Sequence, residues 1–347
     1  MRHGEADMPT PPFRLAAFLI LWMVLPTICR AGEYTADFLR IGVGARPLAK
    51  GGAYVALAHD ATGTYWNPAG LAPQHRFVLH FDHVPLFNGL AQYNTASLNL
   101  AFNRSMSAGL CWIRLGVDEI PRYSALSGSR YDRLTLGKYR STGEAEDFFA
   151  DTEDAVLVSF NRRDYFDLYL GGGFAPIRIP MELALGVTGK YINHRLADAR
   201  GTGQGLDAGI QMRFFSEAKT GDGEPVTWLG FGAMARDLSR TSIVWNTASR
   251  HEDRVRTAWQ TGAAFSALWR PLATRLTVSL DREFGFYREW RAGAELEFFR
   301  ILCLRTGFYQ ERFSAGAGLS LLGLQLDYAF INQDLDNTHR ISGAFHF

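Results

Sequence analysis

Few residues of this chain have the types and spacing that metal binding requires. His75, His80 and His83 are close in sequence, but side chains three positions apart on a strand point to opposite faces, so His80 and His83 are poorly placed to share an ion. The acidic run Glu144–Asp154 offers oxygen ligands for calcium, but it lacks the ordered spacing of a calcium loop, and a solvated external loop is the interpretation we favour. We therefore expect no metal ion and no cofactor.

The other reactive residues do not form a catalytic arrangement either. Cys111 and Cys303 lie far apart inside strand-like runs, which argues against a disulfide framework. The sequence contains no nucleophile elbow and no paired catalytic carboxylates with a base. The glycine-rich stretch 42–52 lacks the strand–GxxxxGK[ST]–helix context of a phosphate-binding loop. We expect that this protein is not an enzyme.

Residues 1–31 have the order of a signal peptide for export. Arg14 precedes the apolar run 15–25, and small residues near Ala31 complete a cleavage site. Three of the 36 basic residues and two of the 35 acidic residues fall in this segment, which leaves 33 of each sign. Nucleic acid binding needs a basic surplus, so we expect no nucleic acid partner. Beyond this segment no apolar run approaches the ~20 residues of a membrane helix.

From residue 76 onward, apolar and polar residues alternate again and again along the chain. The alternation is clearest in five runs: 183–191, 206–214, 276–281, 291–298 and 322–330. Strict alternation indicates strands with one apolar and one polar face. Many of these runs reach the roughly 9–11 residues that a tilted strand needs to cross a bilayer. About fourteen strand candidates fit between residues 76 and 347.

Two kinds of β-protein produce such alternation. A soluble sandwich turns its apolar faces inward, whereas a membrane barrel turns them toward lipid. Export favours the barrel, and so do the aromatic residues at strand ends, which are typical of membrane girdles: Trp112, Tyr191, Phe214, Phe215, Trp228, Trp259, Trp290, Phe298 and Phe299. We predict an all-β fold, a transmembrane antiparallel β-barrel of about 14 strands over 76–347, in contact with lipid of the cell outer membrane.

Loops and the final strand agree with this fold. Two long connections, 118–154 and 236–256, contrast with short turns elsewhere, as in barrels with long external loops. Ile341, Phe345 and Phe347 share one face of the last predicted strand, which must pair with the first to remove the sheet edges. A terminal aromatic in such a strand resembles the insertion signal that the outer-membrane assembly machinery reads, so we expect that machinery as a partner.

The segment 32–75 does not follow the barrel rhythm. Its glycines permit close backbone contacts, and Asn67 before Pro68 indicates a turn. Its motifs strongly resemble the start of the PorV/PorQ family, which is related to FadL-type transporters: Phe38-Leu-Arg-Ile-Gly-Val-Gly-Ala-Arg-Pro, Gly51-Gly-Ala-Tyr-Val-Ala and Tyr65-Trp-Asn-Pro-Ala-Gly-Leu. Later stretches resemble the family too: 185–192, 203–209, 326–330 and 338–342.

The resemblance implies an inward-folded N-terminal hatch or plug. Its candidate residues are Gly42, Gly44, Gly51, Gly52, Asn67, Pro68 and Gly70. Two functions compete: passive transport of a hydrophobic or amphipathic small molecule through a hatch-gated barrel, and a docking role for subunits or cargo of a type IX-like protein secretion system. Fold resemblance alone does not decide between them.

Overall fold

The computed structural model describes residues 36–71, 75–123, 127–136, 144–171, 177–220, 223–285, 288–333 and 337–347. The predicted signal peptide, 1–31, lies outside the described residues, and so do 32–35 and 72–74 of the predicted hatch. Among the described residues, no helix is long and apolar enough to cross a bilayer.

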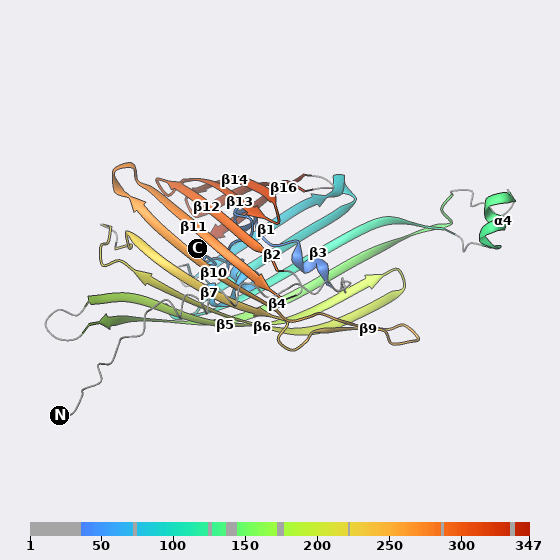
Figure 1. The fold of residues 1–347 in the computed structure, drawn as a ribbon, viewed down its shortest axis with the longest axis horizontal. Coiled ribbons are helices and arrows are strands. Elements are labelled where there is room, and N and C mark those ends of the chain that lie inside the picture. Colours follow the sequence, from blue (N-terminus) through green and yellow to red (C-terminus); the bar gives the residue numbers. More distant parts are fainter. Residues whose placement is uncertain are drawn as a thin grey trace, which may run out of the picture. The chain divides into compact units, whose positions relative to one another are not determined.

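Fourteen antiparallel strands close into a barrel, which confirms the predicted fold class and strand number (Figure 1). Closure comes from the pairing of β1 with β16 and of β5 with β6. The strands are β1 Phe77–Leu86, β2 Ala91–Ala101, β3 Met106–Arg122, β4 Asp147–Leu170, β5 Ile177–Leu196, β6 Ala199–Phe215, β7 Thr227–Arg236, β10 Ala258–Trp269, β11 Thr274–Phe284, β12 Trp290–Phe298, β13 Leu302–Tyr309, β14 Arg312–Leu321, β15 Leu324–Ile331 and β16 Thr338–His346.

The apolar residues of the strands face outward and the polar residues face the lumen. On β12 the outward Leu296 is 39% exposed, whereas its neighbour Glu295 is 5% exposed. On β11 the apolar Val278 and Leu280 are exposed, while Asp281 is buried inside the barrel. This arrangement is the reverse of a soluble sandwich, whose apolar faces form the core. The outer surface therefore contacts lipid.

The two ends of the barrel differ in their connections. Turns of two to four residues join β2 to β3, β10 to β11, β12 to β13 and β14 to β15 at one end. Two connections contain short 3-10 helices, η3 (Phe87–Gly89) and η5 (Arg270–Leu272). Outer-membrane barrels place short turns in the periplasm and long loops outside. The opposite end, which carries the long connections, is therefore the external end.

The connection expected as a loop over 118–154 is largely strand, so that expectation was wrong. β3 continues to Arg122 and β4 begins at Asp147, and the two pair beyond the barrel wall as an arm (Figure 1). The arm carries a short helix, α4 (Arg130–Thr135), which begins with a capping box formed by Ser129 and Asp132. Backbone pairing satisfies the polar groups of this extension although its side chains no longer alternate.

The second expected loop, 236–256, also contains strands. β8 (Ser242–Trp245) pairs with the external part of β6, and β9 (Glu252–Arg254) pairs with β8. This hairpin continues the sheet beyond the point where β7 leaves β6. It therefore covers the long β5–β6 projection on one edge.

The aromatic girdle is confirmed only in part. Trp112 on β3 and Tyr191 on β5 lie at one level, on either side of Val156 of β4, and face outward near the external end; Trp259 is also exposed. Phe215 and Trp228, however, line a cavity inside the lumen, so their prediction as girdle residues was wrong. Both stand at strand ends, where a shift of one position places a side chain on the other face.

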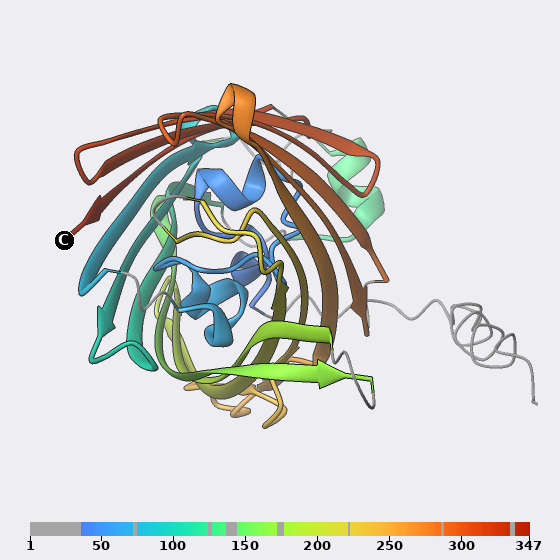
Figure 2. The ribbon, with the colours of Figure 1, turned by 90° about the vertical axis from the view of Figure 1, so that its left-hand side faces the viewer.

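The N-terminal segment 36–71 lies inside the barrel, as Figure 2 shows with this segment in blue. Its short helices are η1 (Asp37–Arg40), α2 (Ala45–Leu48), α3 (Gly63–Trp66) and η2 (Pro68–Gly70). Tyr65 and Trp66 of this segment pack with Tyr93, Ile113 and Leu157 of the wall in the hydrophobic core. We call residues 36–71 the lumenal segment.

Candidate functional site: the lumenal segment and its cavity

Carboxylates of the barrel wall hold the backbone of the lumenal segment. Asp82 of β1 accepts a hydrogen bond from the backbone N–H of Gly44 at 2.6 Å. Asp281 of β11 accepts hydrogen bonds from the backbone N–H groups of Tyr54 and Val55 at 2.8 and 2.9 Å. These N–H groups belong to irregular backbone, so without wall acceptors they would be buried and unpaired.

A second anchor is a buried network of charges centred on Glu295. Its carboxylate accepts hydrogen bonds from Arg46 at 2.9 and 3.1 Å, from Lys50 at 3.4 Å and from Arg305 at 2.6 Å. Arg305 also binds Asp327 at 2.6 Å. Arg46 and Lys50 belong to the lumenal segment, whereas the other three residues belong to the wall. The network therefore joins the segment to β12, β13 and β15 through charge-assisted bonds.

The predicted turn at Asn67 is confirmed. Asn67 is extended, and its Oδ1 accepts a hydrogen bond from the N–H of Ala69 at the start of η2. Its Nδ2 donates to the carbonyls of Val55 and Ile210, so one amide joins two parts of the segment to β6. Pro68 follows as the first residue of η2, where its missing N–H is not needed. A side chain at Gly70 would come within 2.2 Å of the carbonyl oxygen of Ala58.

The four other predicted hatch glycines all have positive φ angles: Gly42, Gly44, Gly51 and Gly52. Gly51 also approaches the wall so closely that a Cβ would lie 2.5 Å from the carbonyl oxygen of Phe308. Its N–H donates to Ser314 at 3.1 Å. The chain therefore needs glycine at this position for its backbone angle and for its contact with β13.

Sequence reasoning missed the wall glycines that receive the segment. A Cβ on any of them would lie within 2.7 Å of an atom of the lumenal segment: Gly109, Gly186, Gly209, Gly232, Gly293, Gly307 and Gly316. At Gly209 the nearest atom is Oδ1 of Asn67, at 2.0 Å. The sequence does show these glycines at strand positions that face the lumen. Their purpose becomes clear only when the lumenal segment is in place, because its atoms occupy the space that a side chain would need.

A cavity of about 820 Å³ lies between the segment and the wall near the short turns. Its lining is amphipathic. Apolar side chains include Leu57, Met181, Phe215 and Trp228, and charged ones include Arg46, Lys50, Arg163, Glu182, Arg213, Arg275 and Glu295. Arg163 and Glu182 form a buried pair at 3.2 Å, while Arg213 donates to the carbonyl of Ala58 at 3.1 Å. Such a lining suits a ligand with both an apolar and a polar part.

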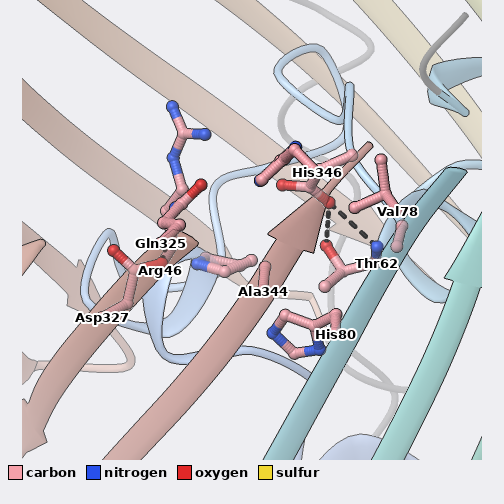
Figure 3. A pocket seen from close by; sticks show the side chains of 11 residues that line it. Arg46, Thr62, Val78, His80, Gln325, Asp327, Ala344 and His346 are labelled. Carbon is pink, nitrogen blue, oxygen red and sulfur yellow. Dashed lines mark hydrogen bonds between the residues drawn. The ribbon is translucent and has the colours of Figure 1, made fainter. Parts of the chain in front are cut away.

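On the other side a small pocket lies between the segment and β1, β15 and β16 (Figure 3). Asp60 accepts hydrogen bonds from the N–H and hydroxyl of Thr62, which fixes the turn before α3. His80 projects inward beside Thr62, whereas His83 is exposed on the outer face. The prediction that these two histidines point to opposite faces is confirmed.

The residues of the predicted insertion signal face outward. Ile341, Phe345 and Phe347 are 66%, 42% and 70% exposed, respectively. Phe347 also packs near Phe77 of β1, with ring centroids 5.9 Å apart. Their recognition by the assembly machinery stays a prediction. Cys111 and Cys303 are both buried and free, as expected for a chain without a disulfide between them.

A closed barrel with an apolar exterior, a charged interior and unequal ends defines the class of this protein. It is a β-barrel of the outer membrane, and its own N-terminal segment occupies the lumen.

Comparison with solved structures finds other barrels. The chain is similar to the toluene transporter TodX of Pseudomonas putida, with 10% identity and a TM-score of 0.45 over 87% of this chain and 96% of that chain. It is similar to the CymD monoaromatic hydrocarbon channel, with 11% identity and a TM-score of 0.36 over 88% and 98%. It is also similar to CdiB from Acinetobacter baumannii, with 9% identity and a TM-score of 0.38; this match covers 78% of this chain but only 60% of that protein. No protein-family model and no curated protein matches the chain.

Proposed function

We propose that this barrel transports a hydrophobic or amphipathic small molecule passively across the outer membrane, as a protein of the PorV/PorQ type, and that it has no enzymatic activity. The observation that carries the proposal is the amphipathic cavity of about 820 Å³ beneath a segment that polar contacts attach to the wall. Because the segment occupies the lumen, it must be able to move before a molecule can pass through the barrel. Movement of the lumenal segment as a hatch would connect this cavity to the external end.

The proposal is tested by reconstituting the chain in vesicles and measuring uptake of a labelled long-chain carboxylic acid. A variant without residues 32–75 should pass the compound faster, and it should also conduct ions in planar bilayers. Protein-free vesicles and vesicles with the heat-denatured chain serve as controls. If the deletion variant stays closed to both, the segment is not the barrier and the hatch mechanism fails.

A second candidate function is docking of secretion-system subunits or cargo. The feature that favours it is the external β3–β4 arm, whose helix α4 exposes Tyr131 and Leu134 at 74% and 65%. Exposed apolar residues on a projecting element are typical of contact surfaces. Replacing residues 123–146 by a short glycine-serine turn should abolish co-purification with an export complex and leave small-molecule uptake unchanged. If uptake falls instead and co-purification persists, the result supports transport and excludes a docking role for the arm.

A further inference from the structure

Three potential metal ligands meet on the inner face of β4 and β5 at the external end. Glu153 lies directly opposite His194 in the β4–β5 pairing, and Asp151 follows two residues along the same face. The imidazole Nε2 of His194 is 2.8 Å from a carboxylate oxygen of Asp151 and 3.6 Å from one of Glu153. One donor atom from each of the three lies within 4.8 Å of the other two.

These residues lie outside the membrane-spanning part of the strands. Trp112 and Tyr191 mark the last aromatic level on the outer face of β3 and β5. Just beyond it, Arg114 and Asp154 form an outward ion pair at 2.7 Å, which lipid tails would not favour. Glu153 is next to Asp154 in sequence, His194 lies opposite Glu153 at the same level, and Asp151 lies two residues further from the bilayer. An ion could therefore reach the cluster from water.

Neighbouring structure restricts the imidazole. The ring of Trp245 on β8 packs against His194, with centroids 4.8 Å apart. Gly201 lies opposite His194 on β6, and a Cβ there would come within 3.0 Å of the Trp245 ring. The glycine thus leaves room for the indole, which limits rotation of the histidine. Restrained ligand orientation favours metal binding because less entropy is lost when the ion binds.

The cluster also has an excess of negative charge. The imidazole of His194 faces two carboxylates, those of Asp151 and Glu153. A divalent cation would supply the missing positive charge.

We propose that Asp151, Glu153 and His194 form a binding site for one divalent transition-metal ion of the zinc type at the external mouth of the lumen. Zinc binds imidazole nitrogen and carboxylate oxygen, and open zinc sites have three protein ligands with water completing the coordination. Two ligand atoms that each lie about 2.1 Å from a tetrahedral ion are about 3.4 Å apart. The distances from Nε2 of His194 to the carboxylates of Asp151 and Glu153, 2.8 and 3.6 Å, lie on either side of this value. Calcium would require more oxygen ligands and does not select imidazole. This inference replaces the expectation, drawn from the histidines at 75–83 and the acidic run 144–154, that no metal binds.

Isothermal titration of the full chain in detergent, without a histidine tag and after chelator treatment, tests the site with ZnCl2. We expect one zinc ion per chain, and binding at least tenfold tighter than that of calcium chloride. His194→Asn and Glu153→Gln should each weaken zinc binding at least tenfold. His251→Asn is the matched control, because His251 is an exposed imidazole 2.9 Å from Asp253 at the same end but outside the three-ligand cluster. It should leave the affinity unchanged.

Each variant is first checked for its compact, unboiled form on a gel, so that a loss of binding is not a loss of folding. The absence of one-to-one zinc binding by the wild-type chain would overturn the proposal. Unchanged affinity in both His194→Asn and Glu153→Gln would also overturn it, because zinc would then bind elsewhere. The same holds if His251→Asn abolishes binding while His194→Asn does not.

Discussion

Replacing Glu295 by glutamine should release the lumenal segment. The substitution keeps the shape of the side chain but removes the charge that Arg46, Lys50 and Arg305 share. Arg305 retains Asp327, whereas no other ion pair is present for Arg46 and Lys50 among the described residues. The variant therefore leaves the buried Lys50 and the partly buried Arg46 of the segment without a carboxylate.

The size of the effect follows from this geometry. Removing one partner of a buried ion pair costs about 3–5 kcal/mol, and glutamine recovers part of this because its amide oxygen still accepts a hydrogen bond. A net loss of about 3 kcal/mol changes the ratio of released to seated segment by roughly 100-fold. The barrel itself keeps its backbone pairing, so the loss falls on the attachment of the segment.

Single-channel recording in planar bilayers measures the open fraction directly. Glu297→Gln is the matched control, since Glu297 lies two residues along the same face of β12 and lines the same cavity. Within the described part of the chain no ion pair joins it to the lumenal segment. We expect frequent openings for Glu295→Gln and wild-type behaviour for Glu297→Gln. Equal behaviour of the two variants, or a closed Glu295→Gln barrel that is folded, would refute the argument.

Three further predictions concern packing, lipid contact and assembly. Gly209→Val should destabilise the seated segment by about 1–3 kcal/mol, because the new Cβ meets the side chain of Asn67, and should lower the melting temperature. Gly189→Val is the control: no atom lies within 4 Å of a Cβ at Gly189, so this variant should melt like the wild type. Val278→Arg places a charge on the lipid face near the middle of β11 and should cost about 2–4 kcal/mol in detergent or lipid folding titrations; a neutral effect would mean that this face does not contact lipid. Phe347→Ala should lower the yield of heat-modifiable barrel in cells but not after refolding in vitro, and an equal loss in both would indicate a folding role instead.

The alternation of side chains predicts the barrel well because lipid and water impose it on every strand that crosses the membrane. On β11 and β12 each residue falls on the predicted face. Beyond the bilayer no lipid contacts the strands, so this requirement no longer applies. The arm of β3 and β4 and the hairpin of β8 and β9 therefore lack a regular alternation of apolar and polar residues, and both were expected as loops. Phe215 and Trp228 mislead for a related reason, since an aromatic at a strand end suits either a girdle or a lumenal cavity.

The candidate site could be predicted only in outline. Close backbone contact at Gly51 and the turn at Asn67 follow from local chemistry, and both were expected. The partners of these residues come from segments far along the chain, such as Asp281 and Gly307, and no local pattern specifies which inward glycine meets which part of the segment. The same limit explains the metal ligands. Asp151 and Glu153 lie about 40 residues before His194, and only the strand register brings the three together.

The type of contact that holds the lumenal segment bears on whether it can move. An interface made only of large apolar side chains would expose much hydrophobic surface to a wet lumen when it opened, at about 25 cal/mol for each Å². Here much of the attachment is polar: carboxylates bind backbone N–H groups at Asp82 and Asp281, and charges meet at Glu295. Water can replace such partners as the segment leaves, which offsets most of the lost bonds. Wall glycines add close contact without a large hydrophobic area. The segment also packs aromatic side chains such as Tyr65 and Trp66 against the wall, so its release exposes apolar surface as well. The polar anchors therefore lower the cost of opening, compared with a wholly apolar interface, without removing it.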